Sequence, residues 1–210
     1  LALTEMAERD DSVVAISADT LDLIGLRGLV QKHPNRVIDA GIAEQNAMGI
    51  ASGMATTGMR PFVCGYAPFV TARSIEQLRN DVAYPNQRVV IGAAASGISL
   101  GVSGGTHHAL EDCAAMSALG MKVIVPVFDK DIAKVINNIS SPTYLRLGLE
   151  TLPEGKDIPK YDSWRLLEKG NNGVAVALGP LAGLIWETIL ELPVNMRPSL
   201  WAVSDIDLNG

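Results

Sequence analysis

The chain sets one acidic side chain among small and apolar residues. Glu44 lies in the stretch DAGIAEQNAMGIASGMATTGMRPF, residues 39–62, in which alanine, glycine and methionine predominate. A carboxyl group at the start of a helix that follows a strand can bind a ligand, so Glu44 is a candidate site residue. The alternative is a first-turn glutamate that complements a helix dipole, worth about 0.3–1 kcal/mol.

Two further groups of side chains could bind or react. Tyr66 and Phe69 lie three residues apart after an apolar run, and His107 and His108 follow the glycine-rich stretch GVSGG. Adjacent histidines point in divergent directions, so we do not expect these two alone to form a metal site. Taken by themselves, the aromatic residues also fit a packed core, and the histidines fit an ordinary polar surface.

Asp19 and Arg146 lie at or near the ends of predicted strands. Without further context, Asp19 fits a turn or N-cap residue equally well, and Arg146 fits an ordinary strand-end salt bridge.

Short apolar runs recur between helix-like stretches. They hardly alternate with polar residues, which indicates strands covered on both faces and so an α/β fold with a mostly parallel sheet and helices on both faces. The runs are SVVAIS (12–17), RVIDA (36–40), PFVCGY (61–66), RVVIGA (88–93), KVIVPV (122–127) and TYLRL (143–147). Helical spacing predicts helices over 43–57, 70–83 and 109–119. Strand ends and helix starts are where such sheets bind ligands, and Glu44 lies at one.

The composition changes in the segment ETLPEGKDIPKYD, residues 150–162. We predict a first domain over 1–150, a linker over 151–162 and part of a second α/β domain over 163–210. The second part contains GVAVALG, a helical PLAGLIWETILEL and SLWAVS, which together are typical of one βαβ unit. The chain begins at Leu1 and holds about half of a second domain, so a shortened sequence is one interpretation.

The overall composition excludes several classes of protein. The 210 residues carry a net charge of −6, without a basic cluster, which argues against binding to nucleic acid or to an anionic membrane. Cys64 and Cys113 are far apart, so neither a disulfide framework nor a zinc site is expected. The sequence shows no apolar leader and no run approaching the ~20 residues of a membrane span. We expect a cytoplasmic protein that acts on small molecules.

Three ordered motifs resemble those of the transketolase family, whose members use thiamine diphosphate. GIAEQN is similar to the signature of the pyrimidine-binding domain, and RPFVCGYAPFVTARSIEQLR to its aromatic segment. GISLGVSGGTHHALED is similar to the glycine-rich loop that ends in THxALED. The likeness covers residues 12–147 and continues weakly to the end of the chain.

The resemblance implies roles in cofactor binding. Glu44 would hydrogen-bond a ring nitrogen of the cofactor's aminopyrimidine and relay a proton. Phe69 would pack against the pyrimidine ring, and Tyr66 would belong to the same pocket. Asp19 would lie near the thiazolium ring. The small, apolar neighbours of Glu44 then provide the environment that such a proton relay needs.

The resemblance also implies substrate contacts and two departures from the family pattern. His107 would contact the substrate and take part in catalysis with Glu44, and Arg146 would hold the substrate phosphate. Ser103 replaces the aspartate of the usual GEDGxTH loop, and Ala95 replaces a histidine found in many members. Both positions contact substrate in the family. We therefore expect retained thiamine chemistry on an atypical substrate, with a catalytically impaired homologue left open.

The family's motif for magnesium and diphosphate, GDG, is absent from the sequence. The resemblance therefore implies a partner, the diphosphate-binding N-terminal subunit of a split transketolase. That partner would supply most of the Mg²⁺ site, and we expect a heterotetramer. No metal ligand is predicted in this chain.

The leading hypothesis is a subunit that transfers a two-carbon ketol unit from a ketose, phosphorylated or otherwise anionic, to an aldehyde. One alternative keeps the cofactor in a 1-deoxyxylulose-5-phosphate synthase-like enzyme or a 2-oxoacid dehydrogenase β subunit. A second alternative is a non-catalytic regulatory homologue.

Overall fold

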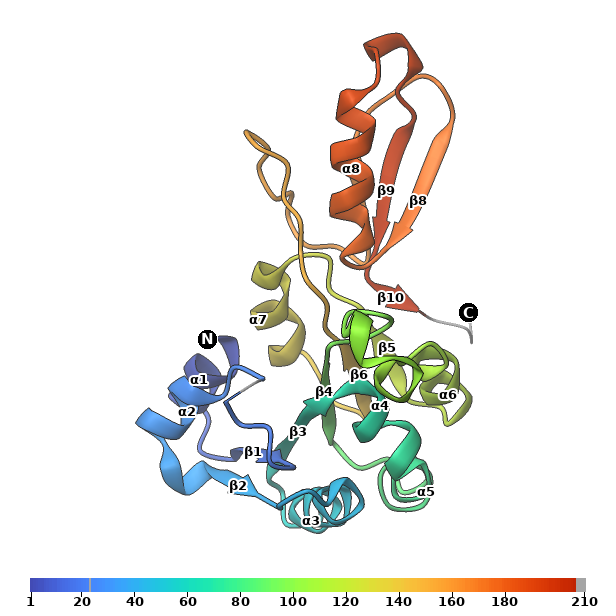
Figure 1. Ribbon diagram of the computed structural model, residues 1–210. Coiled ribbons are helices and arrows are strands. Elements are labelled where there is room, and N and C mark those ends of the chain that lie inside the picture. Colours follow the sequence, from blue (N-terminus) through green and yellow to red (C-terminus); the bar gives the residue numbers. More distant parts are fainter. Residues whose placement is uncertain (23, 207–210) are drawn as a thin grey trace.

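A computed structural model describes residues 1–22 and 24–206 of the chain, which form two sheets (Figure 1). The larger sheet has seven strands in the order β10-β5-β6-β4-β3-β1-β2. Its parallel members are β1 (Val13–Ser17), β2 (Val37–Asp39), β3 (Arg60–Tyr66), β4 (Val90–Ala94), β5 (Lys122–Ile124) and β6 (Thr143–Arg146). β10 (Asp205–Ile206) is antiparallel to β5. The predicted mostly parallel α/β fold is confirmed.

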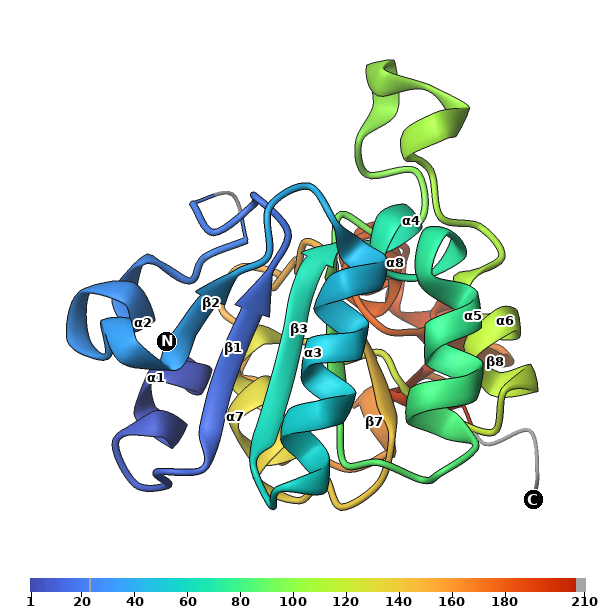
Figure 2. The same ribbon diagram turned by 90° about the horizontal axis from the view of Figure 1, so that it is seen from below.

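Helices cover both faces of this sheet (Figure 2). Residues of α3 (Glu44–Thr56), of the helical stretch after β3 and of α6 (Asp112–Ala118) pack into one apolar cluster with the strands. Residues of α1 (Ala2–Ala7), α2 (Arg27–Lys32) and α7 (Asp129–Asn137) pack into a second cluster on the other face. All five residues of β1 are buried between them, which explains its continuous run of apolar residues.

The helical stretch after β3 differs from the predicted helix over 70–83. It begins earlier and is broken into α4 (Ala67–Val70), a 3₁₀ turn over 72–74, α5 (Ile75–Gln77) and a π-helical segment, Leu78–Ala83. Two side-chain hydroxyls also donate to its carbonyl groups. Thr71 Oγ1 donates to Ala67 O at 2.6 Å, and Ser74 Oγ donates to Phe69 O at 3.2 Å. The prediction of one continuous helix was wrong.

Two other predicted helices were closer to the structure. α3 matches the prediction over 43–57 to within one residue at each end. α6 begins at Asp112 rather than at 109, because the backbone of Ala109 pairs with that of Gly97.

The smaller sheet has the order β7-β9-β8. β8 (Val174–Leu178), α8 (Leu181–Glu191) and β9 (Ser199–Val203) form the predicted βαβ unit, with β8 and β9 parallel. β7 (Trp164–Glu168), which was not predicted, pairs antiparallel with β9. α8 packs on one face of the sheet. The other face, which we call the open sheet face, consists of exposed side chains of Trp164, Leu166, Val174, Val176 and Trp201.

Residues 147–163 connect the two sheets without a helix or a strand. Two features tie the sheets together. The guanidinium of Arg165 in β7 forms a buried ion pair with Asp131 in α7, in which Nη1 lies 3.1 Å from Oδ1. The strand β10 returns from the smaller sheet to the edge of the larger one. Within residues 1–22 and 24–206, no helix is long and apolar enough to cross a membrane.

Candidate functional site

Predicted site residues gather at one edge of the larger sheet, because parallel strands all end there. Asp19 follows β1, and Glu44 begins α3 just after β2. Tyr66 ends β3, and Arg146 ends β6. The fold therefore brings residues that are up to 127 positions apart in sequence to the same edge.

Glu44 is buried at the start of α3, with 6% of its side chain exposed. Its Oε2 accepts a hydrogen bond from Arg73 Nη1 at 2.9 Å. The Gln45 side chain fixes the backbone of the same arginine, because its Nε2 donates to Arg73 O at 3.1 Å. Arg73 was not predicted as a site residue. The available signal was its spacing, four residues after Phe69 in a helical stretch.

Three ring side chains lie next to the ion pair of Glu44 and Arg73. The guanidinium of Arg73 lies over the ring of Phe69, with Cζ 4.4 Å from the ring centroid. The Phe69 ring meets His107 edge to face at 5.2 Å between centroids, and it meets Tyr66 at 6.4 Å. Glu44, Tyr66, Phe69, Arg73 and His107 thus form one group, which we call the site cluster. Four of its five members were predicted.

His107 reaches the site cluster from a projecting loop. The backbones of Gly97 and Ala109 pair at its base, and the loop stands out past the edge of the sheet (Figure 2). His107 Nδ1 lies 3.0 Å from Thr106 Oγ1, and His108 Nε2 lies 3.2 Å from Gly101 O within the loop. Ser103 is exposed in this loop. His107, rather than His108, is therefore the histidine in contact with Phe69.

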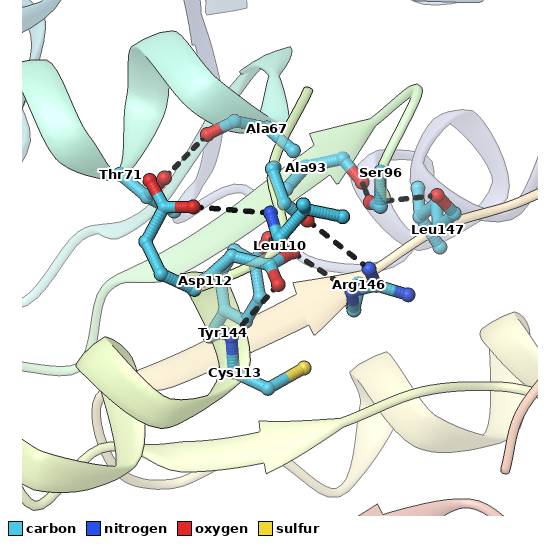
Figure 3. A network of polar contacts seen from close by, with 12 residues as sticks. Ala67, Thr71, Ala93, Ser96, Leu110, Asp112, Cys113, Tyr144, Arg146 and Leu147 are labelled. Carbon is cyan, nitrogen blue, oxygen red and sulfur yellow. Dashed lines mark hydrogen bonds and ion pairs between the residues drawn. The ribbon is translucent and has the colours of Figure 1, made fainter. Parts of the chain in front are cut away.

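Arg146 belongs to a separate network beneath the loop (Figure 3). The carboxylate Oδ2 of Asp112 accepts hydrogen bonds from Arg146 Nε and from Tyr144 Oη, each at 2.8 Å. Burial opposes the charge of Arg146, but the hydrogen bond and charge of Asp112 raise its pKa overall. Burial and the same carboxylate raise the pKa of Tyr144 well above its usual range. Asp112 was not predicted; an acidic residue in the first turn of a helix gives only a weak signal.

Arg146 also lines a cavity of about 530 Å³ between the end of the larger sheet and α8. Ser96, Gly97, Pro180 and Leu181 line the same cavity. Within residues 1–22 and 24–206, no hydrogen bond or ion pair joins Arg146 to the site cluster.

Two predicted positions adopt a left-handed backbone. Asp19 has φ of 56°, and its N–H donates to Asp39 Oδ1 at 2.9 Å. Its side chain is exposed, and the part of the chain that the structure describes gives it no hydrogen bond to the site cluster. Ala95 has φ of 52°, directly after β4. Such strained backbone is concentrated at functional sites.

The site cluster has the chemistry to hold a planar ring that carries nitrogen atoms. The carboxylate of Glu44 can hydrogen-bond such a ring, and the face of Phe69 can stack against it. Its donor set does not suit a metal ion. In the described parts of the chain, no three histidine, cysteine, aspartate or glutamate residues gather closely enough to hold one.

Known proteins with similar sequences or folds provide an independent comparison. The family model for the transketolase pyrimidine-binding domain matches residues 1–153. The chain is 35% identical over 156 residues to one of the subunits of an apulose-4-phosphate transketolase from Phocaeicola vulgatus, covering 72% of this chain and 50% of that relative. It is 31% identical over 192 residues to 1-deoxy-D-xylulose-5-phosphate synthase from Clostridium perfringens, covering 85% of this chain and 30% of that enzyme.

A solved structure of a split-gene transketolase, described as an inactive β4 tetramer, matches with a TM-score of 0.79 and 30% identity. The match covers 98% of this chain and 69% of that one. The chain spans about half the length, or less, of these two curated relatives. Fold, site cluster and sequence agree, and the chain belongs to the family of transketolase pyrimidine-binding domains.

Proposed function

We propose that this chain is the pyrimidine-binding subunit of a two-chain, thiamine diphosphate-dependent transketolase-like enzyme. The enzyme transfers a two-carbon ketol unit from a ketose, phosphorylated or otherwise anionic, to an aldehyde. The observation that carries the proposal is the burial of Glu44 at the carboxyl edge of the sheet, where Arg73 joins its carboxylate to the ring of Phe69. Family membership and the similarity to an apulose-4-phosphate transketolase support it.

The residues present fit the pyrimidine end of thiamine diphosphate. A buried carboxylate suits a ring nitrogen, and the aromatic side chains of Phe69 and Tyr66 suit a flat ring. Asp19 would face the thiazolium end of the same cofactor. When bound, the cofactor supplies a carbon nucleophile and accepts the electrons of the broken carbon–carbon bond.

The chain's own residues would position the cofactor and the substrate and would move protons to and from them. Glu44 would hold and pass a proton at the ring nitrogen. His107, which already lies against Phe69, would hydrogen-bond the substrate and move a proton near it. Arg146 would bind the anionic group of the substrate, with Ser103 as a further contact. The serine and Ala95, which stand in place of an acidic residue and a histidine, favour a substrate unlike that of typical members.

The diphosphate and Mg²⁺ would be bound mainly by a partner, the N-terminal transketolase subunit, in a heterotetramer. The similar β4 assembly is described as inactive, which supports a need for a second kind of chain in this case too. We further infer that residues 1–150 form the pyrimidine-binding domain, 151–162 a linker and 163–210 part of a second domain.

The test is turnover of the assembled enzyme with Glu44→Gln. This change removes the proton relay while keeping the size of the side chain. We expect turnover to fall by about 100-fold or more, the usual contribution of a positioned acid or base. Glu76→Gln, which changes an exposed acid on the same side of the sheet, is the control and should keep turnover. Unchanged turnover in Glu44→Gln with the assembly intact would remove the relay role and favour a non-catalytic homologue.

The donor substrate separates the two enzymatic hypotheses. A transketolase-like enzyme consumes a ketose donor, whereas the synthase-like alternative requires pyruvate. Consumption of each donor by the assembled enzyme, followed by nuclear magnetic resonance, would decide between them. We expect the ketose to be consumed.

A further inference from the structure

Arg73 makes two contacts that match the two partners of the proposed pyrimidine ring. Its Nη1 donates to the buried carboxylate of Glu44 at 2.9 Å. Its guanidinium lies over the ring of Phe69, 4.4 Å from the centroid. The side chain of Gln45 donates a hydrogen bond to the backbone carbonyl of Arg73, so the backbone of Arg73 is fixed next to Glu44.

A guanidinium and an aminopyrimidine share the relevant chemistry. Both are planar, both present nitrogen atoms in that plane to a carboxylate, and both stack on aromatic faces. The face of Phe69 that carries the guanidinium cannot carry a second planar group at the same time. The same holds for the lone pair of Glu44 that accepts from Arg73.

The two partners of this ion pair differ in exposure. The Glu44 side chain is 6% exposed, whereas the Arg73 side chain is 47% exposed. A buried carboxylate without a partner is costly, so Glu44 needs a donor when no ring is bound. Arg73 can swing into solvent at little cost, because nearly half of it is already hydrated.

We propose that Arg73 occupies the pyrimidine position of the cofactor-free chain and is displaced when the ring binds. This inference rests on the proposed function. In this arrangement the guanidinium stands in for the ring, keeping Glu44 paired and Phe69 covered. Binding of the cofactor then has to break the ion pair. The apparent dissociation constant is therefore higher than the intrinsic one, because only the fraction of molecules in which the position is open can bind.

The test compares thiamine diphosphate affinity in two arginine variants. Arg73→Met keeps the long apolar stem but removes every donor. Arg79→Met, a change at an exposed arginine in the same helical stretch, is the matched control. The dissociation constant is measured by isothermal titration calorimetry at saturating Mg²⁺, with each variant assembled with its diphosphate-binding partner. We expect Arg73→Met to bind about two- to fivefold more tightly, the range for a partly exposed ion pair, and Arg79→Met to bind as the unchanged chain does.

A second variant distinguishes loss of the ion pair from misfolding of the variant chain. Arg73→Lys keeps the charge but lacks the planar fork, and it should bind with an affinity between those of the unchanged chain and Arg73→Met. Equal or weaker binding by Arg73→Met, while Glu44→Gln still impairs binding, would overturn the displacement and leave the proposed function intact. Absence of thiamine diphosphate binding by the unchanged assembly would instead remove the proposed function.

Discussion

At the residue scale, Asp112 is the buried charge on which the position of Arg146 depends. It is 1% exposed and serves two donors through one oxygen, while its Oδ1 accepts from the N–H of Cys113 at 2.9 Å. Tyr144 is fully buried, so it has no access to water as a substitute acceptor. Removal of the carboxylate would leave both donors without their acceptor.

We therefore expect Asp112→Ala to lower the free energy of unfolding by about 3 kcal/mol, because it leaves a partly buried cation and a buried hydroxyl unpaired. Tyr144→Phe is the matched control. It removes one hydrogen bond to the same oxygen but leaves the ion pair with Arg146, and it should cost about 1 kcal/mol. Urea unfolding of both variants measures the difference. Equal losses would mean that the ion pair contributes nothing beyond the tyrosine hydrogen bond.

Some residues of the site cluster could be predicted from the sequence, and others could not. Glu44 was detectable because an acid among alanines and glycines is conspicuous and because GIAEQN resembles the transketolase signature, since its position alone also fits a first-turn glutamate. Arg73 was not, since an arginine on the exposed side of a helical segment looks like ordinary solvent-facing charge. Arg73 follows the helix break at Thr71, where the hydroxyl-to-carbonyl hydrogen bond leaves no periodic pattern in the sequence.

At the scale of elements, one ionic contact holds the starts of β1 and β3 together. Arg60 Nη1 donates to Asp10 Oδ2 at 2.7 Å, and its Nη2 donates to Ile136 O in α7 at 3.2 Å. Hydrogen bonds from Ser12 and Arg60 lower the pKa of Asp10 to about 2 from its ordinary 3.8. The contact therefore connects two neighbouring strands with a helix that covers one face of the sheet.

A pH dependence follows from this lowered pKa. Because the folded state binds the proton less tightly than the unfolded state, the stabilisation is present above about pH 4 and is lost as the pH falls toward 2. About a third of the Asp10 side chain is exposed, at 32%, so solvent screening keeps the effect near 1 kcal/mol.

Asp10→Asn should lower the free energy of unfolding by about 1 kcal/mol at pH 7, and by much less near pH 2. Denaturant titrations at both pH values measure this. Asp11→Asn, at a neighbour whose side chain is 96% exposed, should stay within about 0.5 kcal/mol at either pH. A loss that does not change with pH would show that Asp10 acts through packing and not through its charge.

The elements themselves were predictable to different degrees. Strands such as β1 were recognised because burial on both faces demands continuous apolar residues. β7 was missed because its residue types do not follow its burial: Arg165 is buried with Leu167, whereas the apolar Trp164 and Leu166 are exposed. β10 has two residues, too few to carry any pattern.

At the scale of the whole molecule, the open sheet face is the main apolar surface of the smaller sheet. Leu166, Trp201 and Val176 lie side by side across three strands, and each is at least 37% exposed. Contiguous exposed apolar patches of this kind bind apolar molecules or other surfaces. The predicted division at 151–162 remains a prediction, although no helix or strand lies within that segment.

Val176→Lys should reduce the fluorescence of an apolar dye, anilinonaphthalene sulfonate, bound to the folded chain. Its stability should change by no more than about 0.5 kcal/mol, because the side chain is already exposed. Ala177→Lys is the matched control on the same strand. Its side chain lies on the inner face, 4% exposed, so the lysine should unfold the smaller sheet and increase dye binding. Unchanged dye binding in Val176→Lys would mean that the dye does not bind to the open sheet face.

The return of β10 to the larger sheet also imposes an order on synthesis. β5 receives its outer neighbour only when Asp205 and Ile206 pair with Ile124 and Val123. Eighty-one positions separate Ile124 from Asp205, which at about 5–20 residues per second takes roughly 4–16 s to translate. During that interval the outer N–H and C=O groups of β5 form an open edge, of the kind that pairs with other chains. A ribosome that pauses late in this message would therefore lengthen the period in which nascent chains can associate.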